Sequence, residues 1–242
     1  MLLKVKKRGL KTSRLLPKLP ILFNSGVLLF VFIFPNFLWA KVDLIQVVEK
    51  LQYPWAMDFL PGKEALVTEK PGRLQKVNLE TGKKTEIQNF PEVHAVGQGG
   101  LLDVMVHPDF KINQKIFLTF SARTNASGDA TTTLISARLE GQQLLDQKIL
   151  FHADPALPGG HHFGSRVRMG QDGMLYFSVG ERGRMKEAQD PQNHLGTVIR
   201  LKENGKVPQD NPFLKNRNGR AEIFSYGHRN PQGMALHPKT GK

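Results

Sequence analysis

The feature that most constrains the fold of this chain is a repeated alternation of short apolar stretches with turn-forming residues. After Lys41, each apolar stretch is bounded by Pro, Gly, Asn, Asp or a similar turn former, which is typical of short antiparallel strands. No stretch keeps the period of an amphipathic helix. The expected strands cover residues 55–60, 65–68, 74–79, 101–106, 116–120, 132–139, 145–150, 166–169, 174–179, 197–201 and 234–236.

The pattern also restarts along the chain. An apolar strand, a polar turn and a second apolar strand begin again about every 45 to 65 residues, a period that suggests four-stranded propeller blades with insertions. A β-sandwich would also contain many short strands, but it would not restart with the same strand-turn opening. The sequence therefore predicts an all-β chain built as part of a β-propeller.

The number of blades leads to a second expectation. Residues 41–242 supply about three blades and the opening strand of a fourth, whereas a propeller closes with at least four. The last residues, Gly241 and Lys242, fall in the turn after a first strand. The sequence thus predicts a fragment, or the product of an interrupted gene, whose unpaired blade surfaces make it prone to aggregate.

The first 40 residues differ in composition from the rest. A basic stretch precedes the apolar segment Ile21–Phe34, and Ala40 offers a cleavage site before Lys41, which indicates an export signal. Leu38 is large for the −3 position, so an uncleaved anchor is the alternative, although roughly 14 to 18 apolar residues are short for a membrane span. We predict a signal peptide over 1–40, a folded domain over 41–242 and a periplasmic or secreted location, with membrane attachment only through an uncleaved signal.

The charge and the cysteine content exclude some functions. The net charge is +13, but seven lysines and arginines and no acid lie in the first 40 residues, so the remainder carries +6. No run of basic residues interleaved with aromatics indicates a nucleic-acid surface. The absence of cysteine rules out disulfides and thiolate chemistry without fixing the compartment.

Three polar loops precede the expected innermost strands of successive blades: 97–100, 161–162 and 228–233. Because each loop has the same place in its repeat, the ring geometry of a propeller would bring all three to one mouth of the channel. Taken alone, each loop also fits an ordinary turn. Their expected convergence is the main argument from the residues for a functional site.

The chemistry of that site centres on His161 and His162, since imidazole is the side chain best suited to proton transfer near neutral pH. Glu181 ends the next expected strand and fits a carboxylate that orients a histidine base, although a surface ion pair with Arg184 is an alternative. His107 and His237 precede prolines in turns and are expected to be structural, and the histidines lack the spacing of a zinc site.

The ordered set of motifs resembles the soluble PQQ-dependent sugar dehydrogenases, the glucose/sorbosone dehydrogenase family, and within it the periplasmic aldose sugar dehydrogenases. The resemblance runs from about Tyr53 to the last residue. It is carried by Gly97–Leu102, His107–Phe110, His162 with Arg166, Gly180-Glu181, Leu195–Leu201, Asp210–Phe213 and Gly227–Gly233.

The resemblance implies a six-bladed propeller with pyrroloquinoline quinone (PQQ) over its channel. It further implies oxidation of an aldose at the anomeric carbon to the lactone, with hydride transfer to the quinone and an external electron acceptor. His162 matches the general base that takes the proton of the anomeric hydroxyl, and Glu181 falls where the family has the carboxylate that orients this base. His161 stands where some members carry an acid, which leaves the preferred sugar open.

For the cofactor, the resemblance implies contacts from Arg229 and Asn230 and a polar pocket group at Gln98. The family's remaining cofactor-binding cations and its calcium ligands fall beyond Lys242, so no metal ligand is expected among these residues. We therefore expect PQQ and calcium to be the cofactors of a complete member, and this chain to bind PQQ weakly or not at all.

Two other functions stay open. A calcium-dependent propeller lactonase would need several carboxylates and asparagines facing the channel, whereas the loops here offer mainly Gln, His and Arg. A non-catalytic propeller that binds protein or glycan would have no need to keep His162, Arg229 and Asn230 together.

Overall fold

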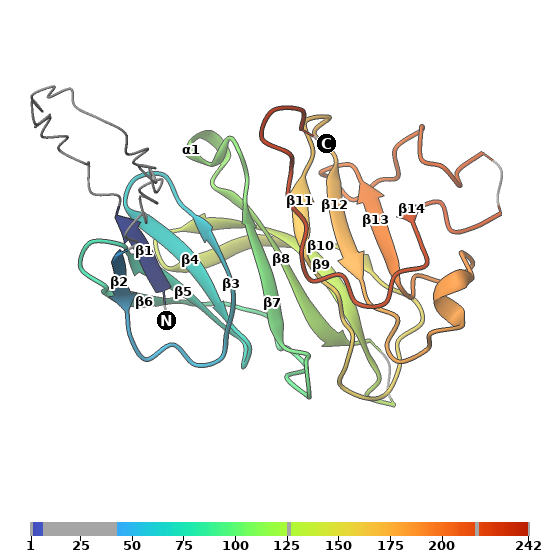
Figure 1. The fold of residues 1–242 in the computed structure, drawn as a ribbon, viewed down its shortest axis with the longest axis horizontal. Helices are drawn as coiled ribbons and strands as arrows, with labels where there is room; N and C mark the ends of the chain where they lie inside the picture. The colour runs from blue at the N-terminus through green and yellow to red at the C-terminus, as the bar shows by residue number, and fades with distance from the viewer. Residues whose placement is uncertain (1, 7–42, 125–126, 216–217, 242) are drawn as a thin grey trace, which may run out of the picture.

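The computed structural model describes residues 2–6, 43–124, 127–215 and 218–241, which fold into three four-stranded antiparallel sheets and a two-stranded one (Figure 1). Each four-stranded sheet is one continuous stretch of chain, with its strands side by side in chain order. The first sheet contains β3 (Pro54–Phe59), β4 (Glu64–Glu69), β5 (Arg73–Asn78) and β6 (Lys84–Ile87).

The other two sheets repeat this arrangement. The second contains β7 (Leu101–Val106), β8 (Lys115–Arg123), β9 (Ala130–Glu140) and β10 (Gln143–His152). The third contains β11 (Val167–Met169), β12 (Leu175–Val179), β13 (Thr197–Leu201) and β14 (Ile223–Ser225). The described helices are short: α1 (Phe110–Asn113) and a 3-10 turn over Glu187–Gln189.

This architecture is the predicted one, three blades of a propeller, with differences in detail. Strands β6 and β14 were not predicted, because their sequences, KTEI and IFS, are too short or too polar to show alternation. The strand expected at 234–236 is wrong: within the described residues this segment has no neighbouring strand with which to form a ladder. Residues 234–236, which were expected to open a fourth blade, are therefore described by the structure but do not form a strand.

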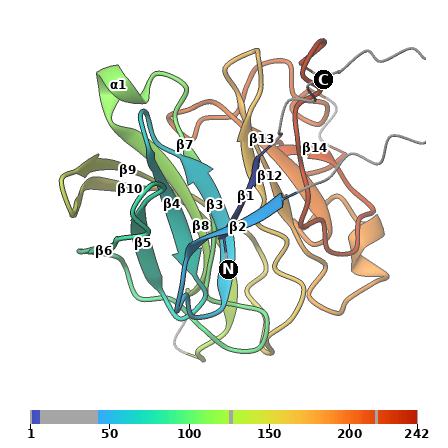
Figure 2. The same ribbon diagram turned by 60° about the vertical axis from the view of Figure 1, so that its left-hand side comes forward.

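The middle sheet is buried on both faces, which explains the stacking of the three sheets. Along β8, Ile116 and Leu118 pack into a core shared with the first sheet, and Phe117 between them packs into a core shared with the third. Successive side chains of a strand point to opposite faces, so one apolar run serves both cores. Figure 2 shows the third sheet, in orange, on the opposite side of the molecule from the first, in blue and teal.

The first strands of the three sheets, β3, β7 and β11, lie next to one another. Buried hydroxyls join neighbouring sheets here: Thr68 Oγ1 donates to the Leu102 carbonyl at 2.6 Å, and Thr119 Oγ1 donates to the Ser165 carbonyl at 2.6 Å. A buried hydroxyl needs a partner, so these bonds fix the register of one sheet against the next. The loops that precede β7 and β11 are thereby held side by side.

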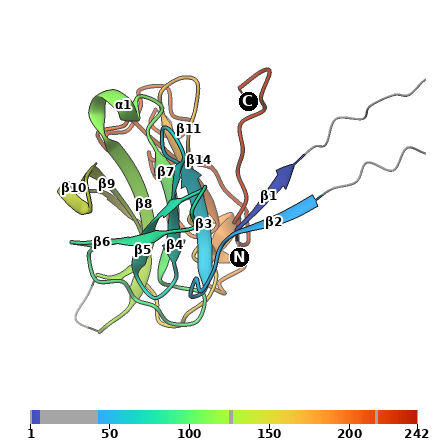
Figure 3. The same cartoon turned by 90° about the vertical axis from the view of Figure 1, so that its left-hand side faces the viewer.

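Strands β1 (Leu2–Lys6) and β2 (Asp43–Val48) form the separate two-stranded sheet (Figure 3). Val48 of β2 packs on Val67 and Val77, which covers the free face of the first sheet. The apolar segment Ile21–Phe34 of the predicted signal lies outside the described residues. In the described part of the chain, no helix has the length and apolar character needed to cross a membrane.

Candidate active site

The loop that leads into β11 carries the predicted base and has an unusual backbone. His162 has a φ of +56°, in the left-handed region that non-glycine residues rarely adopt. Two glycines allow other chain segments to approach this loop closely. A Cβ on Gly180 would lie 1.9 Å from the His162 carbonyl oxygen, and one on Gly97 would lie 2.2 Å from the Gly160 carbonyl oxygen. The glycines of these motifs are therefore required by packing.

His162 and Glu181 form the central pair of the site. The His162 Nδ1 is hydrogen-bonded to Glu181 Oε1, and the Glu181 side chain is 1% exposed. The other carboxylate oxygen, Oε2, is buried and has no hydrogen-bond partner among the described residues. Because a carboxylate accepts, Nδ1 carries the proton, and Nε2 of the neutral ring is left as the acceptor.

Gln98 reaches the same loop from the segment before β7. Its side-chain Oε1 accepts a hydrogen bond from the His162 backbone N–H at 2.8 Å. The backbone N–H of Gln98 donates to the Gly160 carbonyl at 2.5 Å. The residue is exposed, and its amide NH₂ makes no hydrogen bond with the described residues. Gln98 therefore supports the histidine loop while keeping two donors free.

Arg229 and Asn230 close the site from the third polar loop. Asn230 Oδ1 accepts from the Gly164 N–H at 2.9 Å, and the Arg229 carbonyl accepts from the Glu181 N–H at 2.8 Å. The Arg229 residue is exposed, and its guanidinium forms no ion pair or hydrogen bond within the described residues. The structure thus gathers all five predicted residues, Gln98, His162, Glu181, Arg229 and Asn230, around one loop; their roles remain predictions.

The ion pair considered between Glu181 and Arg184 is not formed. The Arg184 guanidinium pairs with Glu187 at 2.9 Å, while the Arg184 backbone N–H donates to the Glu181 carbonyl. Glu181 therefore pairs with His162 rather than with Arg184. His107 and His237 each accept a backbone N–H through Nδ1 within their own turns, as expected for structural histidines.

Sequence analysis gave no role to two arginines that shape the site, although Arg166 was named among the family motifs. Arg166 donates to Asp103 at 2.7 Å and to the Gln232 carbonyl at 2.9 Å, and its guanidinium carbon lies 4.7 Å from the centre of the Trp55 ring. Arg182, directly after Glu181, is buried beneath the histidine loop. No sequence pattern marks Arg182 as part of the site, because its hydrogen-bond acceptors are backbone carbonyls.

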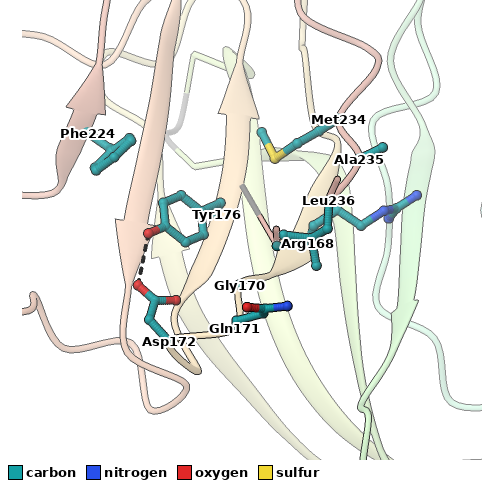
Figure 4. Close-up of a pocket in the computed structure, with 10 residues that line it drawn as sticks. Arg168, Gly170, Gln171, Asp172, Tyr176, Phe224, Met234, Ala235 and Leu236 are labelled. Carbon is teal, nitrogen blue, oxygen red and sulfur yellow. Dashed lines mark hydrogen bonds between the residues drawn. The ribbon is translucent and has the colours of Figure 1, made fainter. Parts of the chain in front are cut away.

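Within the described ranges, no group of three or more His, Asp or Glu side chains is placed to hold a metal ion. A cavity of about 520 Å³ opens instead on the free face of the third sheet. As Figure 4 shows, Tyr176, Phe224, Met234 and Leu236 line it, with Arg168 at its edge. None of the five predicted site residues lines this cavity, so it is a separate feature.

The sheets and loops define the class of protein: a β-propeller whose polar site lies where the loops before the first strands of successive blades meet. Within that class, the chain belongs to the glucose/sorbosone dehydrogenase family, whose family model matches residues 51–242.

Individual relatives agree with this membership. The chain is 39% identical over 209 residues to the aldose sugar dehydrogenase YliI of Escherichia coli K12, a match that covers 83% of this chain and 56% of the relative. The apo crystal structure of the soluble aldose sugar dehydrogenase from Escherichia coli superposes with a TM-score of 0.78 at 38% identity, covering 83% of this chain and 58% of that one.

A third relative is the PQQ-bound form of an aldose sugar dehydrogenase from Streptomyces coelicolor. It has a TM-score of 0.66 at 31% identity and covers 76% of this chain and 53% of that one. The chain therefore spans about half the length of the relatives that it matches.

Proposed function

We propose that this chain carries the histidine–carboxylate part of a PQQ-dependent aldose dehydrogenase, which oxidises the anomeric carbon of a sugar to the lactone. The observation that carries the proposal is the His162–Glu181 pair, which leaves Nε2 as a proton acceptor at the meeting point of three loops. The names of the related proteins and the PQQ-bound neighbour support the reaction class.

The residues present fit the cofactor. PQQ is an anionic ortho-quinone with three carboxylates, so it requires cations and hydrogen-bond donors. The exposed guanidinium of Arg229 and the NH₂ groups of Gln98 and Asn230 form no hydrogen bond with the described residues and are available as donors. When bound, PQQ would supply the two-electron acceptor of the reaction.

Each residue then has a defined task. His162 Nε2 takes the proton of the hydroxyl on the anomeric carbon. Glu181 stabilises the resulting imidazolium and keeps Nδ1 protonated. Bound PQQ would accept the hydride of that carbon, which would leave the sugar as the lactone, and the positive charge of Arg229 would stabilise negative charge developing on the quinone.

Several finer points belong to the same proposal. We expect calcium to be bound by the complete enzyme, an external acceptor to reoxidise the cofactor, and the 41–242 domain to be exported after removal of the signal over 1–40. Because the chain spans about half the length of its relatives, we expect the 242-residue chain alone to bind PQQ weakly and to turn over slowly.

The test joins this chain to the part of the Escherichia coli relative that it does not match. With PQQ and calcium, we expect the fusion to reduce a dye in the presence of aldoses and the chain alone to do so far more slowly. A fusion that folds and binds PQQ, seen as a quinone absorption that shifts on binding, but oxidises no aldose would refute the proposed function.

A further inference from the structure

The strained backbone of the histidine loop requires an explanation that the reaction itself does not supply. His162 has a φ of +56°, Ser165 of +83° and Arg182 of +54°, three left-handed non-glycine residues within two neighbouring loops. Such conformations persist only where surrounding contacts hold them, and they gather at functional sites. The contacts that hold His162 should therefore be identifiable.

The peptide unit between His161 and His162 is held from both sides. Its carbonyl accepts a hydrogen bond from Arg182 Nε at 2.9 Å, and its N–H donates to Gln98 Oε1 at 2.8 Å. With both ends of this peptide fixed, its plane cannot rotate, and rotation of that plane is what would return φ of His162 to an ordinary value. The imidazole then projects from a fixed backbone toward Glu181.

Arg182 does more than hold one carbonyl. Its guanidinium also donates to the carbonyls of Ala130 at 2.5 Å, Gly159 at 2.8 Å and Leu157 at 3.3 Å. Ala130 begins β9 of the second sheet, whereas the other acceptors belong to the segment that leads to the third. One planar cation therefore fastens the histidine loop to a neighbouring blade.

The burial of this cation is also specific. Arg182 is 6% exposed, and its guanidinium carbon lies 3.8 Å from the centre of the Phe163 ring, itself buried. Burial lowers the pKa of Arg182 to about 10, so the group is still charged at neutral pH. Burying a charged arginine whose partners are mainly carbonyl oxygens and a ring face costs folding free energy. The hydrogen bonds that its planar shape makes are therefore expected to serve the site.

We propose that Arg182 is a positioning residue for His162: by gripping the His161 carbonyl opposite Gln98, it holds the left-handed backbone that aims the imidazole at Glu181. The link to proton transfer rests on the proposed function. The positioning itself concerns only this chain, so it is measurable without cofactor or sugar.

The experiment follows one ¹H NMR signal, the low-field resonance of the His162 Nδ1–H, in the ¹⁵N-histidine-labelled chain. The hydrogen bond to Glu181 moves this resonance to low field, and its loss in the variant His162→Gln assigns it. We expect Arg182→Gln and Arg182→Lys both to lose it, because lysine keeps the charge but cannot donate to four separated carbonyls. The matched control Arg184→Gln, two residues along the same loop, keeps it. Added N-ethylguanidine restores the signal in Arg182→Ala.

A folded Arg182→Gln that keeps the resonance, or an Arg184→Gln that loses it equally, would overturn the proposal. Should the Arg182 variants fail to fold, Gln98→Met releases the other side of the same peptide from an exposed position; an unchanged signal there counts equally against it.

Turnover separates this inference from the proposed function. In the fusion described above, we expect Arg182→Gln to lower kcat by about 100-fold with little change in KM, since the buried guanidinium contacts the chain's own carbonyls and the Phe163 ring. If the fusion oxidises no aldose while the resonance still depends on Arg182, the proposed function fails and the positioning role stands.

Discussion

At the scale of single residues, the site is built from contacts that leave one nitrogen unused. The Nδ1 of His162 is bound to Glu181, and the backbone around the ring is held by hydrogen bonds, so Nε2 is the ring nitrogen left without a partner among the described residues. Glu181 is buried with one oxygen unpartnered among the described residues. The pair therefore fixes the tautomer and the orientation of the His162 ring.

We predict that His162→Gln lowers aldose oxidation by the fusion about 10³-fold, the usual contribution of a general base, while PQQ binding persists. Steady-state dye reduction and a PQQ absorption titration measure the two effects. An exposed histidine outside the site offers a matched control: His237→Gln should retain most of the rate. A His162→Gln enzyme with a near-normal rate would exclude this residue as the base.

The sequence could predict that three loops meet because they recur at the same place in each blade, and the family resemblance singled out Gln98, Arg229 and Asn230 within them. It could not predict how they contact one another. Gln98 was expected to face the cofactor, yet its side-chain oxygen Oε1 accepts a hydrogen bond from the His162 backbone N–H. Arg182 escaped notice because its partners are backbone carbonyls, which every residue carries and no sequence pattern reveals.

At the scale of strands and sheets, a buried carboxylate joins the second and third blades. Asp103 on β7 is fully buried and accepts from Arg166 at 2.7 Å, from Arg168 at 3.1 Å and from the Val167 N–H at 2.8 Å. Burial raises the pKa of Asp103, although the two arginines and the backbone donors oppose that shift. The carboxylate connects the first strands of two sheets near the site.

We predict that Asp103→Ala lowers the free energy of unfolding by roughly 3 kcal/mol, because it leaves Arg166 and the Val167 N–H without their buried acceptor. Urea unfolding of the chain measures the loss. Asp146→Ala removes a carboxylate from a surface ion pair with Arg138 on β9 and should change stability little. Equal losses in the two variants would contradict the role given to Asp103.

A second ion pair, on the free face of the third sheet, predicts a pH dependence. Burial alone would raise the pKa of Asp172, but hydrogen bonds from Arg200 at 2.8 Å, the Met174 N–H and the Tyr176 hydroxyl lower it. The unfolded carboxylate therefore binds a proton at a higher pH than the folded one. Its contribution to stability is present above about pH 4 and is lost as the pH falls through the folded value.

We predict that the stability difference between the natural chain and Asp172→Asn is largest near neutral pH and shrinks below about pH 4. Thermal unfolding across that range measures it, and Arg200→Met, which removes the cation, should show the same dependence. A difference that does not vary with pH would mean that the carboxylate charge contributes nothing.

Strand prediction succeeded and failed for physical reasons. Strands β7, β8 and β12 carry apolar residues over most of their length, because they lie inside stacked sheets, and they were found. Strand β6 lies at a sheet edge and is largely polar, so only pairing with β5 defines it. Residues 234–236 look like a strand, but a strand also needs a neighbour to bond.

At the scale of the whole molecule, the three sheets form a stack with unequal ends. The middle sheet is covered on both faces, and β2 packs on the free face of the first sheet. On the free face of the third sheet, residues 234–236 and Gly241 line the cavity of about 520 Å³ beside Tyr176 and Phe224. Apolar surface of this kind, exposed at the end of a stack, favours association.

We predict that the 242-residue chain self-associates in a concentration-dependent way through this face. Phe224 and Leu236 are 44% and 41% exposed and line the cavity, so burying them against a second copy removes apolar surface from water. The double variant Phe224→Lys/Leu236→Lys places charge there and should shift the chain toward monomer in sedimentation velocity runs over a range of concentrations.

Ile112→Lys is the control, since Ile112 is 86% exposed on α1, far along the chain from the cavity-lining residues. If the control reduces association as much as the double variant does, general charge repulsion rather than this face is responsible; if the natural chain is monomeric throughout, the cavity is not an association surface at all.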